Sequence, residues 1–341
     1  MEDGSDAVDT IHHLQRTFEA NQWSFMPVYP RGHVQIQNHL PWGVFNVFFP
    51  VVLTTATLWC VRRVMVVLVP PVGRRAGIAL HGKAWLEPGG HGRTVDWRRF
   101  SNVVHCTLLH ISLSAYVMRA LWAELSDWFA DPSLWWLFMQ PSLSPSLRAY
   151  YLFEIGVTWE ATLTMLGGVL TGRPCDTPMM VHHAATLAVL LFAWRFGFAR
   201  VGAAVLAMHD ASDVPIDVLR LGQALESDTL IYSGAAGAVL SWAYLRVYCF
   251  PRYVIASAVL QTTHLRVIFA FMGPTNITAG YVLYVAPLVL LWLLSCAWLY
   301  ELLSKVLAKL VGSPPCARLA RFASDPKSGS VRRRSREEAQ R

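Results

Sequence analysis

The 341-residue sequence has little charge: only 15% of its residues are charged, whereas 54% are hydrophobic. A soluble domain has about 25% charged residues, so this composition excludes an ordinary soluble protein. The segment 40–61 contains no charged residue, and about 20 apolar residues are enough for one helix to cross a bilayer. The sequence therefore predicts an all-α integral membrane protein whose first transmembrane helix covers residues 40–61.

Other features are also missing. The six cysteines form no CxxC pair and no metal-type spacing, and most lie in apolar segments, so we expect buried free thiols rather than a disulfide framework. The first residues, MEDGSDAVDT, lack the basic start and apolar core of a cleaved signal peptide. We therefore expect the first span to remain as an anchor.

The formal net charge of +7 comes from residues in a loop and a tail rather than in a recognisable nucleic-acid module, so we expect no nucleic-acid partner. The loop, residues 62–102, contains eight basic residues against two acidic ones (Arg62, Arg63, Arg74, Arg75, Lys83, Arg93, Arg98 and Arg99; Glu87 and Asp96). The tail, residues 311–341, is basic and of disordered character. The positive-inside rule places both in the cytosol and the N-terminal segment 1–39 in the lumen. We interpret the PPVG and EPGGHG patches of the loop as turns.

The remaining apolar segments predict about seven transmembrane helices in all. Further spans are expected at about 103–122, 150–170, 230–250 and 281–303, with two more inside 181–222 that are split near 195–200. The apolar segment 254–273 is interpreted as re-entrant or interfacial, because an odd number of spans places both basic regions on one side. Asn276 begins an Asn-Ile-Thr glycosylation sequon that is usable only in the lumen.

Ionisable residues gather in two consecutive apolar segments, where each costs several kcal/mol unless it has a partner or lines a wet cavity. The first contains His182 and His183; the second contains a longer series (His209, Asp210, Ser212, Asp213, Asp217 and Arg220). Residues three or four apart share a helix face, so the three aspartates form one stripe. Adjacent histidines point about 100° apart, so at most one points straight at a site on a facing helix. We interpret this concentration as a functional site rather than as structural contacts between helices.

Two further interpretations concern this stripe. Pro215 removes a backbone hydrogen bond and predicts a kink or break that opens the helix beside Asp210 and Asp213. Histidine and aspartate are also good metal ligands, but adjacent histidines cannot easily converge on one ion, and we expect no metal. Polar contacts between helices explain Glu154 and Glu160 at least as well as a catalytic role does.

The residues favour acid–base or nucleophilic chemistry. A carboxylate that accepts a hydrogen bond from an imidazole fixes its tautomer and makes its other ring nitrogen a better base or nucleophile. The candidate catalytic residues are His182, His183, Asp210 and Asp213.

These motifs resemble the ceramide synthase family of the TLC-domain superfamily, the longevity-assurance acyltransferases. The family pattern is HHxxT, RxG and HDxSDxxLExxK; the sequence has HHAAT, ARVG and HDASDVPIDVLR, inside a segment, 103–310, that we assign as the TLC acyltransferase domain. The departures from the family pattern are Ala193-Trp194, Gly197, Asp217, Arg220 and Ser295. They affect substrate details more than the four candidate catalytic residues.

The resemblance implies a barrel of six helices in the endoplasmic reticulum membrane, with a lumenal N-terminus and a cytosolic C-terminus. It implies transfer of an acyl group from fatty acyl-CoA, a co-substrate rather than a bound cofactor, to a sphingoid base, among membrane lipids. One histidine would act as a base or form an acyl-imidazole, and Asp210 and Asp213 would orient it and hold the ammonium group of the base. The supporting or substrate-binding candidates are Thr186, Arg200, His209, Ser212, Asp217, Arg220 and Trp298.

Several alternatives stay open at this point. Arg62, Arg63 and Arg220 are candidates for the CoA phosphates, although a role in topology is the favoured explanation for each of them taken singly. The chain length, the base, and the need for a homodimer or a small accessory subunit are not specified. A non-catalytic TLC protein that senses or carries lipids or assists membrane-protein insertion is the alternative function, and a TLC enzyme acting on another amine is a third.

Overall fold

The computed structural model describes residues 40–122, 144–195, 198–260 and 276–311, and within them the chain is helical with no β-strand. The elements, in order, are α2 (Leu40–His81), the 3-10 turns η1 (Lys83–Leu86) and η2 (His91–Arg93), α3 (Trp97–Tyr116), the π-helical η3 (Val117–Leu121), α5 (Pro145–Leu170), α6 (Thr177–Arg195), α7 (Ala199–Leu225), α8 (Asp228–Ser241), the π-helical η5 (Trp242–Ile255), α9 (Ala256–Leu260) and α11 (Asn276–Val311). The all-α prediction is therefore confirmed for the described residues.

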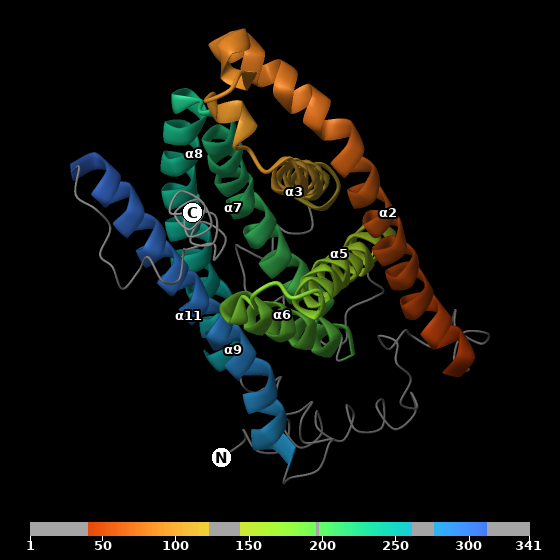
Figure 1. The fold of residues 1–341 in the computed structure, drawn as a ribbon. Helices are drawn as coiled ribbons and strands as arrows, with labels where there is room; N and C mark the ends of the chain where they lie inside the picture. The colour runs from red at the N-terminus through yellow and green to blue at the C-terminus, as the bar shows by residue number, and fades with distance from the viewer. Residues whose placement is uncertain (1–39, 123–143, 196–197, 261–275, 312–341) are drawn as a thin grey trace, which may run out of the picture.

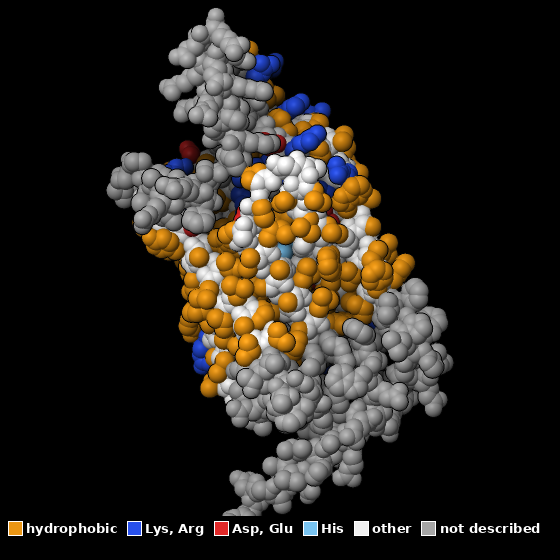
Figure 2. Space-filling model, turned by 60° about the horizontal axis from the view of Figure 1, so that its bottom comes forward, with side chains coloured by type: hydrophobic (Ala, Val, Ile, Leu, Met, Phe, Trp, Pro, Cys, Tyr) orange, Lys and Arg blue, Asp and Glu red, His pale blue; other side chains and the backbone are white. Residues whose placement is uncertain are grey.

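Four described helices are long and apolar enough to cross a membrane, at Val47–His81, Trp97–Ala120, Thr177–Trp194 and Val282–Lys309. Their outward side chains are apolar: Val67 is 71% exposed and Leu283 is 67% exposed. Figure 2 shows a broad belt of hydrophobic side chains on one face, with Lys and Arg gathered mainly beyond one edge of it. A continuous apolar surface of this kind is stable only in lipid, so the chain is a multi-pass α-helical membrane protein.

The first helix differs from its prediction. α2 does not end near Val61 but continues to His81, through Pro70 and Pro71; the interpretation of PPVG as a turn is therefore wrong, whereas EPGGHG does form turns between η1 and η2. Prolines are tolerated in membrane helices because neighbouring groups satisfy the freed carbonyls. The charge of Arg62, which suggested the end of the span, is neutralised inside the protein by Glu160.

Helix α7 lies at the centre of the arrangement. It packs against α2, α3, α5, α6, α8 and η5, while Figure 1 shows α2 along one edge of the molecule and α11 along the opposite edge. The helix is continuous through Pro215, so of the predicted kink or break, the break is absent.

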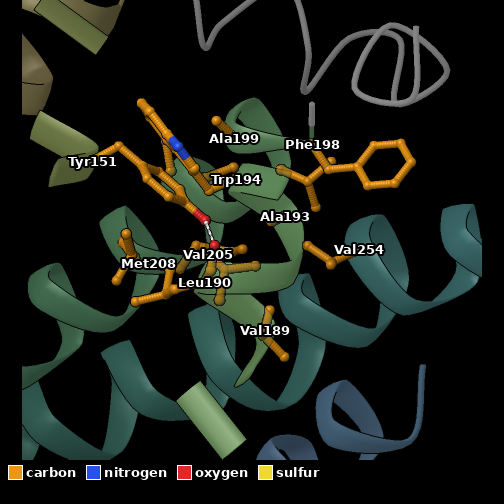
Figure 3. Close-up of a cluster of buried hydrophobic side chains, with 14 of the residues drawn as sticks. Tyr151, Val189, Leu190, Ala193, Trp194, Phe198, Ala199, Val205, Met208 and Val254 are labelled. Atoms are coloured by element: carbon orange, nitrogen blue, oxygen red, sulfur yellow. Dashed lines mark hydrogen bonds between the residues drawn. The ribbon is translucent and has the colours of Figure 1, made fainter. Parts of the chain in front are cut away.

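The apolar core holds α5, α6 and α7 together around Tyr151 (Figure 3). The Tyr151 ring stacks on Trp194 at 5.7 Å between centroids, and its hydroxyl donates to the carbonyl of Leu190 at 2.8 Å. A Cβ at Gly202 would lie 2.6 Å from the Tyr151 ring. Glycine at this position allows α7 to approach α5 closely, as small residues do between membrane helices.

A second apolar cluster ties the connector between α2 and α3 to the turn between α7 and α8. Trp85 is 5% exposed and its indole N–H donates to Glu226 at 3.3 Å. His81 contacts the carbonyl of Leu225 at 2.8 Å, and His91 pairs with Glu226 at 3.0 Å. Glu226 caps α7 in the left-handed conformation, with φ of 52°.

The remaining predictions are tested only in part. Cys60, Cys106, Cys175, Cys249 and Cys296 are free thiols as expected, but Cys60 and Cys175 are exposed rather than buried. The N-terminal segment 1–39, the greater part of the segment 254–273 and the tail from residue 312 lie outside the described residues.

Candidate functional site

Three aromatic or imidazole rings from three helices meet beside the centre of α7. The His182 ring of α6 lies 6.3 Å from that of His209 in α7 and 5.3 Å from the Trp298 ring in α11. His209 Nδ1 contacts the carbonyl of Val205 at 2.8 Å; because a carbonyl only accepts, Nδ1 carries the proton and Nε2 has the free lone pair. Within the described residues, neither His209 Nε2 nor His182 Nδ1 has a hydrogen-bond partner, and both are buried. The site therefore holds two imidazole nitrogens that are not engaged by the fold.

The second histidine of the pair is held by a different helix. His183 Nδ1 lies 3.3 Å from the Thr162 hydroxyl of α5. That hydroxyl already donates to the carbonyl of Thr158 at 2.7 Å, so it accepts from His183. The two adjacent histidines therefore differ in role: α5 fixes His183, while His182 faces His209 and Trp298.

The three aspartates of α7 point to three different neighbours. Asp210 is 7% exposed, accepts from the Tyr150 hydroxyl of α5 at 2.9 Å, and interacts with the carboxyl group of Glu154. Glu154 is 3% exposed and its Oε1 has no partner among the described residues. No ion pair within the described residues joins either carboxyl group to a cation.

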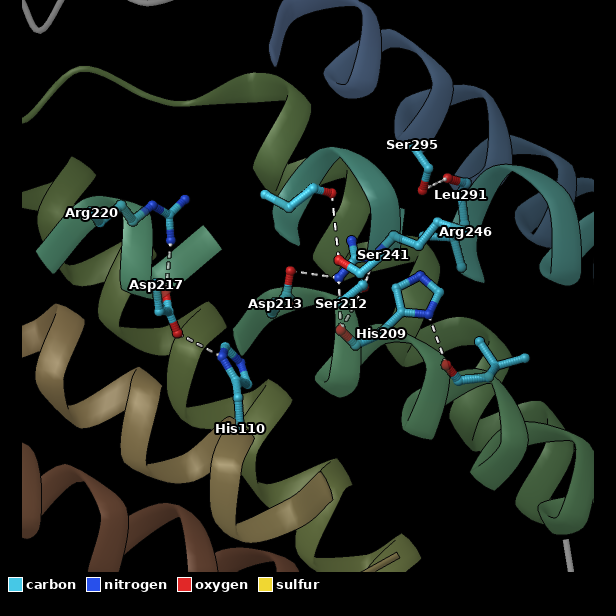
Figure 4. Close-up of polar contacts among 12 residues, drawn as sticks. His110, His209, Ser212, Asp213, Asp217, Arg220, Ser241, Arg246, Leu291 and Ser295 are labelled. Atoms are coloured by element: carbon cyan, nitrogen blue, oxygen red, sulfur yellow. Dashed lines mark hydrogen bonds and ion pairs between the residues drawn. The ribbon is translucent and has the colours of Figure 1, made fainter. Parts of the chain in front are cut away.

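Asp213 pairs with Arg246 of the π-helical segment η5 (Figure 4). Arg246 Nη2 lies 2.6 Å from Asp213 Oδ1 and donates to the carbonyl of His209 at 3.0 Å. Arg246 Nε donates to the Ser212 hydroxyl at 2.6 Å. The guanidinium also lies 4.2 Å from the centroid of the Trp242 ring, and the residue is 2% exposed.

Asp217 forms a separate ion-pair group with α3, also drawn in Figure 4. It is fully buried, contacts His110 Nδ1 at 2.8 Å and accepts from Arg220 of its own helix at 3.2 Å. Arg220 is half exposed, at 52% of its side chain. Asp217 therefore already has two cationic or potentially cationic partners.

The structure brings together His182, His209, Ser212, Asp213 and Trp298, through ring contacts and through Arg246. No hydrogen bond among the described residues joins Asp210 or Asp213 to His182 or His183. Thr186 lies one turn after His182 on α6 and is partly buried, and Arg200 lies in the first turn of α7, at the far end from the aspartates. Ser295 of α11 is fully buried and donates to the carbonyl of Leu291 at 2.8 Å. Asn276 is the first residue of α11.

Arg62 is engaged within the protein by an acidic residue. Its guanidinium forms two contacts with Glu160, at 2.8 and 2.6 Å. Arg63, in contrast, is exposed, with its guanidinium 4.8 Å from the Trp59 ring.

Sequence reasoning missed Arg246, His110 and Tyr150. Each comes from a helix distant in sequence from the aspartate that it contacts, by 33 to 107 residues in the case of the two ion pairs. The available signal was the presence of ionisable or polar residues inside apolar segments, which in a membrane helix mark a partner or a site.

Within the described residues, no group of three or more His, Cys, Asp or Glu side chains is arranged to hold a metal ion. The arrangement that is present supports proton transfer or nucleophilic attack by an imidazole beside buried carboxyl groups.

Comparison with known proteins adds a family. The TLC-domain family matches residues 99–304, more than half of the chain. This range contains α5, α6, α7, α8, η5 and most of α3 and α11, and with them the histidines and aspartates of the site and Arg246.

Individual relatives share a modest sequence identity with this chain, over only part of their length. The chain is 31% identical over 136 residues to ASC1-like protein 1 of Oryza sativa subsp. japonica, covering 38% of this chain and 44% of the relative. It is 26% identical over 155 residues to Ceramide synthase LOH2 of Arabidopsis thaliana, covering 45% and 51%. It is 24% identical over 187 residues to Ceramide synthase 5 of Homo sapiens, covering 54% and 42%. The chain thus spans about half the length of the curated relatives that it matches.

Proposed function

The chain belongs to the TLC-domain family, and from that premise we propose that it is a ceramide synthase. It would join the amino group of a sphingoid long-chain base to the acyl group of a fatty acyl-CoA, giving ceramide or dihydroceramide and free CoA. Relatives named ceramide synthase support this reaction class. The observation that carries it is the contact of His182 with His209, which brings the HHAAT and HDASD blocks of two helices together.

His182 is the histidine that reacts, since its Nδ1 is buried and unengaged whereas Nδ1 of His183 is held by Thr162. As a general base, His182 takes a proton from the amine as the amine nitrogen attacks the thioester carbonyl; the C–S bond breaks and the CoA sulfur takes up a proton. As a nucleophile, the imidazole nitrogen bonds to the acyl carbon and CoA leaves as the thiol. The amine then attacks the same carbon, and the bond to the imidazole breaks.

Asp210 is the carboxyl group proposed to hold the ammonium group of the base. Asp213 already faces Arg246, and Asp217 faces His110 and Arg220. Asp210 interacts with Glu154 instead. The negative charge of this carboxyl pair could therefore neutralise the positive charge of a bound ammonium group. A buried charge needs a partner of opposite sign, and the substrate amine supplies one.

We also propose the finer topology. Seven spans would come from α2, α3, α5, α6, α7, α8 continued by η5, and α11, six of them forming a barrel around the acyl chain in the endoplasmic reticulum membrane. The N-terminus would be lumenal and the C-terminus cytosolic. Glycosylation at Asn276, detected as a mobility shift that endoglycosidase removes and that Asn276→Gln lacks, would place the start of α11 in the lumen. If no shift appears even after a spacer is inserted to move the sequon farther from the bilayer, the result would argue against this topology.

The test of the reaction is acyl transfer by the purified protein in detergent, with sphinganine and a panel of acyl-CoAs differing in chain length. Wild type is compared with His182→Ala and His183→Ala, and with His91→Ala as a matched control, because His91 lies in the connector between α2 and α3 and contacts Trp85 and Glu226. We expect ceramide from wild type and from His91→Ala, and none from His182→Ala.

Two results would redirect the proposal. Absence of product from folded wild type, also after addition of membrane extract to supply an accessory subunit, would favour a non-catalytic lipid-binding role. Product formed from another amine but not from sphinganine would favour a different TLC-type acyltransferase. Intact mass measured after mixing with acyl-CoA alone separates the two routes, since only the nucleophilic route adds an acyl group to the protein.

A further inference from the structure

Arg246 makes several polar contacts at the site, and although the family resemblance includes its segment, YLRVYCFPR, the sequence analysis assigned it no role. It is 2% exposed and makes three contacts with one short stretch of α7: the carbonyl of His209, the Ser212 hydroxyl and the Asp213 carboxylate. A guanidinium has a rigid planar set of donors, so these contacts together fix both the distance and the rotation of α7 relative to η5.

The segment that presents Arg246 is unusual in its own geometry. The π-helical η5 spans 14 residues, Trp242–Ile255, and π-helical turns occur frequently at functional sites. Trp242 of the same segment lies under the guanidinium and against Trp298, at 6.3 Å between ring centroids. Trp298 in turn lies against His182. Arg246 therefore contacts the His209 carbonyl directly, and a series of ring contacts through Trp242 and Trp298 connects it to His182.

We propose that Arg246 is a positioning residue for the acyl transfer, a role that rests on the proposed function. Its guanidinium holds the His209 turn of α7 at the distance from His182 that the reaction requires. In this view Asp213 acts as the anion that keeps Arg246 in place, not as a group that contacts the substrate. Small displacements of catalytic groups are costly, since a shift of about 1 Å can lower a rate about a hundredfold.

The first experiment compares Arg246→Met, Arg246→Lys and the control Arg252→Met in the ceramide assay, per folded molecule. Arg252 lies in the same segment, but it is exposed and its guanidinium faces only Tyr253 among the described contacts. We expect kcat to fall roughly tenfold to a hundredfold in Arg246→Met, with the KM for acyl-CoA within about twofold. Arg246→Lys should be intermediate, because an ammonium can pair with Asp213 but cannot reach all three acceptors. Arg252→Met should match wild type.

The second experiment separates the two possible roles of Asp213. If Asp213 serves Arg246, the double variant Arg246→Met/Asp213→Asn should be no slower than Arg246→Met alone, because the two changes remove the same interaction. A double variant that is slower by the full product of the two single effects would show that Asp213 acts independently, and would overturn this part of the proposal. A raised KM for acyl-CoA with an unchanged kcat in Arg246→Met would show that Arg246 binds the substrate, and would overturn the rest.

A third measurement does not depend on the substrate. Imidazole 15N NMR of the protein in nanodiscs, with His209 assigned from His209→Gln, should show protonated Nδ1 and free Nε2 in wild type and a different environment in Arg246→Lys and in Ser212→Ala. Unchanged His209 signals in both variants would overturn the proposal. If folded wild type forms no ceramide, the proposed function fails, while the NMR comparison still tests whether Arg246 positions His209. If Arg246→Met does not fold, Arg246→Lys and Ser212→Ala provide the test.

Discussion

The ion pair between Arg62 and Glu160 provides a quantitative test of how α2 is held against α5. The two contacts are 2.8 and 2.6 Å long, and the side chains are 16% and 2% exposed. Arg62→Met keeps most of the apolar stem but removes the cation. It leaves the buried Glu160 carboxylate with the Thr164 hydroxyl as its neighbour, at 2.9 Å.

The magnitude follows from the burial of the carboxylate. Removing one partner of a buried ion pair destabilises a protein by about 3–5 kcal/mol. The hydrogen bond from Thr164 is present in both proteins and cancels in the difference, so we expect a loss of about 3–5 kcal/mol in the free energy of unfolding. The double variant Arg62→Met/Glu160→Gln should regain most of the loss, because the uncompensated charge is removed as well.

The free energy of unfolding is measured by SDS titration in mixed micelles, and the KM for acyl-CoA is measured separately on the same variants. Arg63→Met is the matched control: Arg63 is exposed and lies over Trp59, so its loss should cost less than about 1 kcal/mol. The reasoning is refuted if Arg62→Met is as stable as wild type, or if the double variant is no more stable than Arg62→Met. A large rise in the KM for acyl-CoA at unchanged stability would instead indicate that Arg62 contacts CoA.

Three other changes have definite expected outcomes. Gly202→Val should lower the free energy of unfolding by about 1–3 kcal/mol through collision with Tyr151, whereas Gly167→Val, where a Cβ meets nothing within 4 Å, should cost far less; equal losses would contradict the packing argument. Trp85→Ala should cost about 3–5 kcal/mol, seen as a lower Tm, because Trp85 is 5% exposed; an unchanged Tm would mean that the connector is not part of the folded unit. Glu154→Gln should raise the KM for the sphingoid base more than the KM for acyl-CoA, and equal KM changes for both substrates would argue against the carboxyl pair as the ammonium site.

Local signals in the sequence were sufficient to locate most helices. The segments α3, α5, α6 and α7 lie close to the predicted spans because long apolar runs in lipid must form helices to satisfy their own backbone. The prediction for α2 stopped too early, at Val61, because Arg62 and the two prolines normally end a span. The charge of Arg62 is neutralised by Glu160, which is 98 residues away in the sequence, and the helix continues through both prolines.

The aspartate stripe illustrates the same limit at the site. Helical spacing predicted that Asp210, Asp213 and Asp217 form one stripe on α7, but it could not predict that each contacts a different neighbour. The expectation that Asp210 and Asp213 orient a histidine directly finds no hydrogen bond among the described residues. Which partner each carboxylate takes depends on how the neighbouring helices rotate about their axes, and helical periodicity within one segment carries no information on that.

The sequence alone therefore determined the class of the protein, the two consecutive helices that carry the histidines and the aspartates, and the different directions of His182 and His183, because composition and helical period act locally. Only the tertiary structure decided that His182 meets His209 and Trp298, and that Arg246 holds the His209 turn. These contacts join four separate helical segments, and their geometry is set by the close packing of all the helices around α7.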